Sequence, residues 1–451
     1  MAGSRPTTGV TPRERVLDAR VEVPGSKSIA NRALVCAALA SGTSTLFGVP
    51  AGDDTAAMVS GLASLGVRIT LDGTCAAVHG TGGRLAPGDH LVAARLAGTT
   101  SRFLTAVGAL APGTVTVDGD PPLRTRPMAP LHDALSALGA EVRPLERQGH
   151  LPVRVGRGGL RGGTVALPGD VSSQYVTALM LIAPLLERGL TIELTSPLVS
   201  RPYVAITAAV MAEFGARGIA VGEHAVRVEP GGYSAGELNV EPDASSASYP
   251  LAAAAICGGR VSVPGLGTES LQGDARFAGL LAMMGCSVTV DAGATTVSRD
   301  PAGTLRGIES VDMADLSDLV PTLAVVAAFA TSPTRITGVG FIRQKESDRL
   351  GDLVAELTAL GADAAEEDDG MVIRPADLHG GRVGTHHDHR LAMALSLVGL
   401  VVPGVVVEDP AVVSKSWPQW WEVLARLARD GQSDQSDQSD QAERAGEAGH
   451  G

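Results

Sequence analysis

Six helix-like stretches rich in Ala, Val and Leu recur along the chain, each preceded by a short polar segment. The first polar start lies at Ser26, and successive starts follow at intervals of 71 to 73 residues, at Thr99, Ser172, Ser245, Ser317 and Asp388. Each stretch that follows is apolar nearly all round, which is typical of a buried helix. Regular recurrence of one pattern indicates six copies of a single structural unit.

A second pattern keeps the same period. In five of the units a helix ends at a glycine and a strand follows, at Gly66, Gly139, Gly215, Gly285 and Gly361. Glycine at this position is typical of a helix C-cap. Between the buried helix and this glycine the sequence predicts a strand, a charged loop and an amphipathic helix. The predicted strands cover residues 43–47, 114–118, 190–194, 260–263, 334–337 and 405–408.

This alternation predicts an α/β protein of two similar domains, with three units in each. The sequence supports a break near residues 241–245, between the third and fourth units. A strand-like segment at 15–23 precedes the first full unit and is expected to complete another one. We therefore assign residues 1–24 and 243–430 to one discontinuous domain and residues 25–242 to an inserted domain. Residues 431–451, which include QSDQSDQSDQ, read as a disordered polar tail.

Composition narrows the class of protein. Of the 451 residues, 44% are hydrophobic but only 3% are aromatic, and 56 are glycine, which suits a globular core packed with small aliphatic side chains. The net charge of −13 argues against a nucleic-acid partner. The first residues lack the apolar run of a secretory signal, and no apolar run is long enough to span a membrane without interruption. The scattered Cys36, Cys75, Cys257 and Cys286 fit a reducing cytoplasm.

Cationic residues recur at two fixed places in the unit, the mouths of the buried helices and the loops after the strands. They are Lys27, Arg124, Arg201, Lys345, Arg349, Arg390 and Lys415. Taken singly, each is more readily explained as a solvated surface charge. Because they recur at equivalent positions of the repeated unit, we expect them to lie close together. Arginine guanidinium and lysine ammonium groups bind carboxylate and phosphate, so the pattern indicates a small-molecule substrate with more than one anionic group.

Two carboxylates among these cations are candidate proton carriers, Asp318 and Glu346. The alternatives are an ordinary charge at a helix start for Asp318 and a surface ion pair for Glu346. Ser172, Ser173 and Gln174 offer neutral hydrogen bonds to a polyhydroxy or phosphorylated ligand, or simply cap a helix.

The cluster of His386, His387 and His389 around Asp388 has the residue types of a metal site. Side chains so crowded along the chain do not easily converge on one ion, and no second cluster supplies further ligands. We therefore expect no metal.

Nine segments in this order resemble the 3-phosphoshikimate 1-carboxyvinyltransferase family. They are PGSKSIANRAL, LAGTTSRFL, GDPPLRTRPM, VSSQYVTAL, SRPY, DLSDLVPTLAV, RQKESDRL, HDHRLAMALSLV and SKSWPQWW, between residues 24 and 421. The resemblance implies two domains of three βαβαββ units each, an inside-out α/β barrel arrangement, with the site in the cleft between them. It implies a monomeric, cytoplasmic transferase of the shikimate pathway that needs no cofactor. The enzyme would transfer the enolpyruvyl group of phosphoenolpyruvate to the 5-hydroxyl of shikimate 3-phosphate and release phosphate, through a tetrahedral intermediate.

The resemblance also implies roles for individual residues. Shikimate 3-phosphate would be bound by Lys27, Ser28, Arg32, Ser172, Ser173, Gln174, Ser200, Tyr203, Asp318 and Lys345. Phosphoenolpyruvate would be bound by Lys27, Gly98, Arg124, Gln174, Arg349, Arg390 and Lys415. The catalytic group would comprise Asp318, Glu346, Lys27 and Lys345. Asp318 would act as the base at the substrate hydroxyl and Glu346 as the acid at the methylene carbon.

Three positions depart from the family's bacterial pattern. Leu96 and Phe341 stand where asparagines are usual, and Pro122 occupies the usual position of an arginine. The last change leaves open whether Arg124 or Arg126 contacts phosphoenolpyruvate. Gly98 is retained, so the resemblance implies inhibition by glyphosate.

Two alternatives remain at this stage. The sister family that acts on UDP-N-acetylglucosamine usually carries a Cys in the loop that corresponds to residues 119–127, and this loop has none. The second alternative is a repeat scaffold that binds anions without catalysis. Reversed charges at Lys27, Glu346 or Arg390 would favour it, but all three positions keep the charge that the catalytic family has there.

Overall fold

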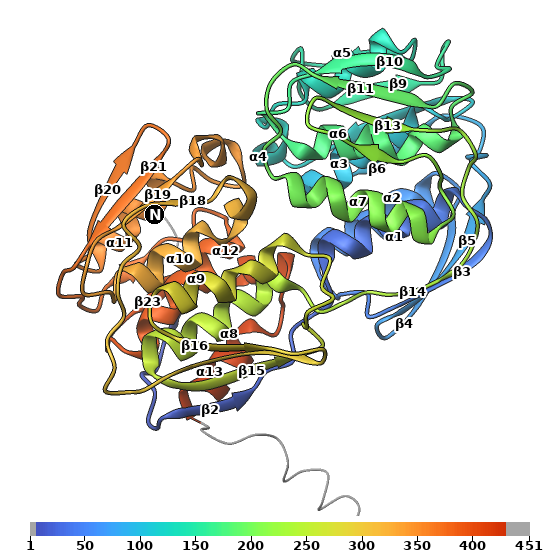
Figure 1. Cartoon of the computed structure of the whole chain (residues 1–451). Helices are drawn as coiled ribbons and strands as arrows, with labels where there is room; N and C mark the ends of the chain where they lie inside the picture. Colours follow the sequence, from blue (N-terminus) through green and yellow to red (C-terminus); the bar gives the residue numbers. More distant parts are fainter. Residues whose placement is uncertain (1–5, 430–451) are drawn as a thin grey trace, which may run out of the picture.

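The computed structural model describes residues 6–429, and these form two lobes that lie side by side (Figure 1). Each lobe has its own hydrophobic core. One core is built from residues between Ile29 and Val240, and we call this part the first lobe. The other combines residues 10–21 with residues between Ala244 and Ala428, and we call it the second lobe. The predicted tail at 431–451 lies outside the described residues.

The first lobe contains three four-stranded sheets. In order across each sheet, the strands are β14(Glu237–Asn239), β3(Ser41–Phe47), β5(Cys75–Thr81) and β4(Arg68–Asp72); β6(His90–Ala93), β7(Thr114–Asp118), β9(Val153–Gly156) and β8(Glu141–Pro144); and β10(Gly163–Leu167), β11(Leu190–Leu194), β13(Ala225–Val228) and β12(Ala220–Val221).

The second lobe contains two four-stranded sheets and one three-stranded sheet. Their strands are β2(Leu17–Arg20), β15(Gly259–Pro264), β17(Ala294–Arg299) and β16(Ser287–Val290); β18(Val311–Asp312), β19(Thr334–Thr337), β21(Gly370–Arg374) and β20(Asp363–Glu367); and β22(Arg382–Val383), β23(Val406–Glu408) and β1(Thr7–Gly9).

All six sheets begin with the same mixed pairing. The first strand pairs parallel with the second, and the second pairs antiparallel with the third. β2 lies parallel to β15, with Ala19 opposite Val261. The segment at 15–23 therefore completes the fourth unit, as expected, although more than 200 residues separate the two strands in sequence. The chain is an α/β protein of six small mixed sheets.

The predicted buried helices are present. They are α1(Lys27–Leu39), α3(Gly98–Gly108), α6(Ser173–Ile182), α8(Ala244–Cys257), α10(Val320–Ala327) and α12(His389–Ser396). The fifth differs from the prediction because a 3₁₀ helix, η3(Ala314–Leu319), with a kink at Leu316, precedes α10. The remaining helices are α2(Asp53–Ser64), α4(Pro121–Arg124), α5(Ala129–Ala137), α7(Arg201–Glu213), α9(Phe277–Met283), α11(Gly351–Ala359), α13(Trp420–Arg429), η1(Ala183–Leu185), η2(Gly273–Arg276), η4(Gly340–Gln344), η5(Leu397–Leu400) and η6(Pro410–Lys415).

The five predicted helix-ending glycines all have a positive φ, between +80° and +103°. Side chains other than glycine rarely adopt this conformation, so the helix stops and the chain turns into the next strand. This prediction is confirmed.

Two connecting segments of the chain run between the lobes and lie against each other. Gly25 pairs antiparallel with Pro242, and the amide of Ser26 donates to the carbonyl oxygen of Glu241 at 2.8 Å. A Cβ on Gly25 would overlap the carbonyl oxygen of Gly48, so only glycine fits there. The connection places the start of α1, with Lys27, at the boundary between the lobes.

Candidate functional site

A pocket of about 110 Å³ lies between the lobes, and both lobes contribute to its walls. Most of the predicted site residues line it: Lys27, Ser28, Arg32, Gly98, Ser172, Ser173, Gln174, Ser200, Tyr203, Asp318, Lys345, Glu346, Arg349 and Arg390. Of the other predicted cations, Lys415 contacts Glu346, whereas Arg124 and Arg201 are absent from the lining.

The first turns of four buried helices meet at this pocket, those of α1, α3, α6 and α12. Ser172 caps α6 by accepting from the amide of Gln174 at 3.3 Å, and Asp388 caps α12 by accepting from the amide of Arg390 at 2.9 Å. The free N–H groups and dipole of a helix N-terminus attract anions. The repeat therefore brings several anion-attracting helix ends to one place.

Lys27 is held in place by a carboxylate from the same lobe. Its Nζ lies 2.9 Å from Oδ2 of Asp54, which is buried at the start of α2. Burial opposes the charge on Lys27, but the attraction of Asp54 outweighs it and raises the pKa of Lys27 above its usual value. Lys27 therefore keeps its positive charge within the pocket.

Asp318 accepts from three cations. Its carboxylate oxygens lie 2.6 Å from Nζ of Lys345, 2.9 Å from Nη1 of Arg349 and 2.7 Å from Nη2 of Arg390. Burial would raise the pKa of Asp318, but these charges, led by Arg390, hold it well below its usual range. Asp318 is ionised at neutral pH and has the charge state of a base.

Glu346 is likewise surrounded by cations. Its carboxylate lies 2.8 Å from Nη2 of Arg349, 3.1 Å from Nζ of Lys415 and 3.4 Å from Nη1 of Arg126. Burial favours the neutral acid, yet these neighbours, led by Lys415, hold the pKa of Glu346 well below its usual value. An anionic ligand that drew these cations away would raise that pKa again.

Arg349 connects the two carboxylates. Its side chain is 1% exposed and contacts Asp318 and Glu346 as well as Asp388, whose Oδ2 lies 2.6 Å from Nε. Burial opposes the charge, but the three carboxylates raise the pKa of Arg349 above its usual value. Because one planar guanidinium bonds both Asp318 and Glu346, it fixes their relative position.

The structure distinguishes the two arginines left open by the sequence. Arg126 lines the pocket and contacts Glu346, whereas Arg124 lies outside it and is paired with Asp118 at 2.6 Å and Glu146 at 3.2 Å. The pocket lining therefore favours Arg126 over Arg124 as the arginine of this loop that belongs to the site. Arg201, another of the recurring cations, begins α7 with an exposed side chain and also lies outside the pocket lining.

Arg32 supports the wall of the first lobe. Its guanidinium donates to Thr207 Oγ1 at 2.7 Å and to the carbonyl oxygens of Ser28 and Tyr203, at 2.7 and 3.2 Å. Burial lowers the pKa of Arg32 to about 10, which still leaves it charged at neutral pH. It therefore orders the hydroxyl-rich side of the pocket.

The structure shows contacts for two of the residues that depart from the family pattern, Leu96 and Phe341. The carbonyl oxygen of Leu96 accepts from Nζ of Lys415 at 3.0 Å, so this contact needs no particular side chain at position 96. Phe341 lines the pocket, with Nζ of Lys345 lying 5.6 Å from the centre of its ring.

The three clustered histidines, His386, His387 and His389, have separate surroundings. His386 contacts Glu356 at 2.6 Å, His387 contacts Asp409 at 3.4 Å, and His389 is buried beside the pocket. Among residues 6–429, no group of three or more His, Cys, Asp or Glu side chains could hold a metal ion. Within the same residues, no helix is long and apolar enough to cross a membrane.

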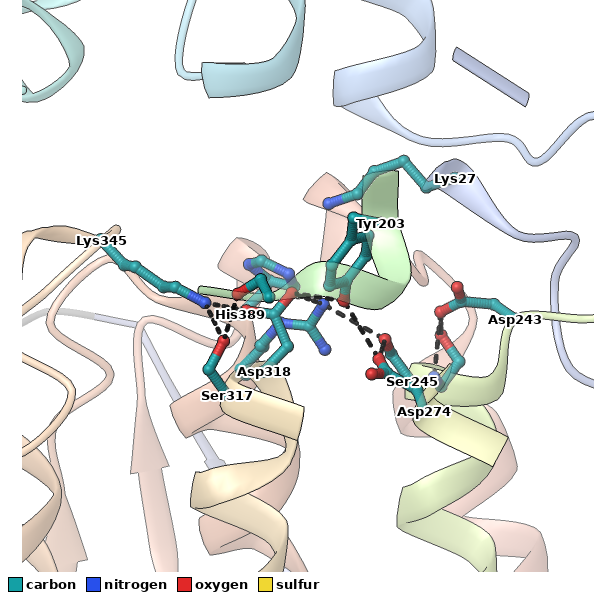
Figure 2. A network of polar contacts seen from close by, with 12 residues as sticks. Lys27, Tyr203, Asp243, Ser245, Asp274, Ser317, Asp318, Lys345 and His389 are labelled. Atoms are coloured by element: carbon teal, nitrogen blue, oxygen red, sulfur yellow. Dashed lines mark hydrogen bonds and ion pairs between the residues drawn. The ribbon is translucent and has the colours of Figure 1, made fainter. Parts of the chain in front are cut away.

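Among the residues near the pocket that sequence reasoning did not assign to the site are Asp54, Ser245, Asp274 and His389. Asp54 and His389 adjoin predicted residues or helix starts, so their positions in the repeat could have indicated them. The loops of the fourth unit carry little positive charge, so the sequence alone favours a structural role for that unit. Instead, Ser245 and Asp274 of that unit lie next to Tyr203 and Asp318 (Figure 2).

The chain is similar to known proteins over most of its length. A family profile described as EPSP synthase (3-phosphoshikimate 1-carboxyvinyltransferase) matches residues 11–424. The 3-phosphoshikimate 1-carboxyvinyltransferase of Methanoculleus marisnigri is 42% identical over 410 residues, covering 90% of this chain and 96% of that protein. Its counterpart from Yersinia pseudotuberculosis is 42% identical over 421 residues, covering 91% and 96%. The solved EPSP synthase of Acinetobacter baumannii superposes with a TM-score of 0.78 at 26% identity, covering 93% of this chain and 97% of that one.

Proposed function

The chain belongs to the 3-phosphoshikimate 1-carboxyvinyltransferase (EPSP synthase) family and is a transferase of the shikimate pathway, and from this premise we propose how its pocket carries out the reaction. Shikimate 3-phosphate and phosphoenolpyruvate bind between the lobes. The observation that carries the proposal is the convergence of cations on Asp318 and Glu346, with Arg126 reaching Glu346 from the opposite lobe.

The hydroxyl-rich wall fits shikimate 3-phosphate. Ser172, Ser173, Ser200 and Tyr203 belong to the first lobe and face the pocket beside Arg32. Hydroxyl groups both donate and accept hydrogen bonds, which suits a polyhydroxy ring and its phosphate. Lys345 of the second lobe, 2.6 Å from Asp318, extends this subsite toward the base.

The cationic side fits phosphoenolpyruvate. Arg126, Arg349, Arg390 and Lys415 supply forked and point charges for its carboxylate and phosphate, with Lys27 between the two subsites. Gly98 leaves room there, because a Cβ at that position would lie 2.7 Å from Nη1 of Arg126.

The reaction is an addition followed by an elimination. Asp318 accepts the proton of the 5-hydroxyl of shikimate 3-phosphate while the oxygen bonds to C2 of phosphoenolpyruvate. Glu346 delivers a proton to C3, which gives a tetrahedral ketal phosphate with a methyl group. Loss of a methyl proton to Glu346 and departure of phosphate then restore the double bond. The surrounding cations stabilise charge on the departing phosphate.

Proton delivery by Glu346 follows from competition for its cations. Arg126, Arg349 and Lys415 hold its pKa low when they pair with it. Phosphoenolpyruvate is itself an anion that these groups bind, so its arrival weakens those pairs and raises the pKa of Glu346. The carboxyl then holds a proton where the methylene carbon lies.

We further infer that the lobes are two domains, residues 25–242 and residues 1–24 with 243–430, each of three βαβαββ units in an inside-out α/β barrel. Their separate cores and the paired crossing segments at Gly25 and Pro242 support this division. Binding of both substrates would draw the domains together. A monomeric, cytoplasmic enzyme is the accompanying expectation, and light scattering after size exclusion tests the oligomeric state.

Phosphate release tests the proposed function. The full chain mixed with shikimate 3-phosphate and phosphoenolpyruvate should release one phosphate for each enolpyruvyl group transferred. UDP-N-acetylglucosamine in place of the shikimate should give no release. Release only with the nucleotide sugar, or with neither acceptor, would contradict the proposal.

A further inference from the structure

The hydroxyl of Tyr203 lies between two carboxylates of the opposite lobe (Figure 2). Tyr203 belongs to α7 of the first lobe, and its Oη lies 3.2 Å from Oδ2 of Asp274 and 3.3 Å from Oδ2 of Asp318. A phenol has one proton to donate, so the two carboxylates compete for it. Burial raises the pKa of Tyr203 well above its usual value, which keeps that proton in place.

Asp274 is built into the second lobe at this boundary. It lies in η2, is 4% exposed, and accepts a short hydrogen bond from Oγ of Ser245 in the first turn of α8. Oγ of Ser245 in turn lies 3.5 Å from Nη2 of Arg390, which binds Asp318. Asp274 is thus connected to the site through Tyr203 on one side and through Ser245 and Arg390 on the other.

One oxygen of Asp274 is unsatisfied. Within residues 6–429, its buried Oδ1 has no hydrogen-bond partner. A cavity of about 10 Å³, the size of one water, lies beside it and is lined by Ser28, Tyr203 and Ser245 among others. A buried carboxylate with an unpaired oxygen is costly, which calls for a reason beyond packing.

The two carboxylates have opposite surroundings. Asp318 contacts three cations, whereas Asp274 has no ion pair within the described chain. Burial, together with the charge of Asp318, raises the pKa of Asp274 to about 6, while that of Asp318 is held well below its usual range. Environments that separate two carboxylates in this way give them separate tasks.

We propose that Asp274 is a positioning residue of this enzyme, which holds the hydroxyl of Tyr203 across the lobe boundary and so fixes the tyrosine against shikimate 3-phosphate. By accepting the hydrogen bond from the phenol, Asp274 turns the Tyr203 hydroxyl away from Oδ2 of Asp318, which can then accept the proton of the substrate hydroxyl. The inference rests on the proposed function, because it assigns Tyr203 and Asp318 to that substrate.

The neighbouring Gln272 provides a control for a merely structural role. It is buried in the same loop, but its side chain bonds the carbonyl oxygen of Pro242 at 2.7 Å and the amide of Ala244 at 3.0 Å, and it contacts neither Tyr203 nor Asp318 by a hydrogen bond within residues 6–429. Gln272→Ala should lower the melting temperature without a selective effect on either substrate.

Steady-state kinetics of the full chain test the proposal. Asp274→Ala should raise KM for shikimate 3-phosphate about tenfold or more, the range expected for a hydrogen bond to a charged group, and change KM for phosphoenolpyruvate about twofold at most. Tyr203→Phe should have a similar effect, and Asp274→Ala combined with Tyr203→Phe should be no worse than the more impaired single variant. Asp274→Asn keeps an accepting oxygen and should restore most of the affinity.

Several results would overturn the inference. They are an unchanged KM for shikimate 3-phosphate in Asp274→Ala, or effects of the two substitutions that multiply in the double variant. If Asp274→Ala does not fold, Asp274→Asn and Tyr203→Phe carry the comparison, and a loss in Asp274→Asn as large as that in Tyr203→Phe contradicts the acceptor role. An inactive wild-type chain would instead refute the proposed function, and this inference with it.

Discussion

Nη1 of Arg126 lies 3.4 Å from Oε1 of Glu346, although the two residues are 220 positions apart and belong to different lobes. Lys415 reaches the same oxygen at 3.1 Å. Contact between Arg126 and Glu346 requires the lobes to be close together. The separation of the lobes and the charge state of Glu346 are therefore linked.

The two arginines of the same loop should behave differently. Arg126→Ala should raise KM for phosphoenolpyruvate about tenfold or more, because it removes a charged donor to the anion. Arg124→Ala, its matched control, removes a pairing with Asp118 and Glu146 outside the pocket and should change KM about twofold at most. Phosphate-release kinetics measure both, and the reverse order would return the assignment to Arg124.

Glu346→Gln should lower kcat by about 100-fold or more, since general acid–base groups contribute at least that much. Substrate binding should be retained, because the amide keeps the shape of the carboxylate. Glu367→Gln, in the exposed pair with Arg335, serves as the control and should behave like the wild type. Wild-type turnover in Glu346→Gln would remove Glu346 from proton transfer.

Asp54→Asn should shift the alkaline limb of the pH profile of kcat/KM to lower pH. Asp54 raises the pKa of Lys27, and a lysine loses its charge as pH rises through its pKa, so without that carboxylate the loss comes earlier. Asp53→Asn is the matched control, because Asp53 contacts Ser414 instead. An alkaline limb that stays in place in Asp54→Asn would separate Lys27 from this part of the profile.

Gly98→Ala should weaken binding of phosphoenolpyruvate and of glyphosate. The added Cβ would lie 2.6 Å from Nη1 of Arg102 and 2.7 Å from Nη1 of Arg126, and such overpacking costs about 1–3 kcal/mol, which corresponds to about fivefold or more in affinity. Gly279→Ala, with open space around its Cβ, is the control. Equal inhibition of wild type and Gly98→Ala by glyphosate would contradict the placement of Gly98.

The contribution of Asp274 to the free energy of unfolding should depend on pH. A carboxyl whose pKa is raised on folding favours the folded state below its ordinary pKa, and that contribution is lost as pH rises through about 6. Asp318, Asp243 and Arg390 are the charged groups that act on it. The melting temperature of wild type minus that of Asp274→Asn should therefore fall between pH 5 and pH 7.5, whereas a constant difference would contradict this.

Much of the fold follows from local sequence. The glycine C-caps, the strands and the buried helices are set by short patterns that a period near 70 residues repeats. The kinked 3₁₀ start before α10 was not predicted, because tertiary packing around Leu316 and Ser317 overrides the helical pattern there.

The site was less predictable where contacts join distant units. Arg124 and Arg126 have equivalent local surroundings in sequence, and only the pairing of Arg124 with Asp118 and Glu146 separates them. Asp274 lies in a loop with little positive charge, so no local pattern indicated it. Its position depends on Tyr203, which reaches it from the other lobe.

The central claim is that addition to phosphoenolpyruvate, with proton transfer at C3, precedes loss of phosphate. The most direct measurement is nuclear magnetic resonance of the reaction of the full chain with both substrates in D₂O. A methyl group formed by proton transfer from solvent-exchanged Glu346 retains deuterium when another hydrogen leaves, so we expect deuterium in the enolpyruvyl methylene of the product together with free phosphate. Free phosphate with no deuterium at that carbon would contradict the account.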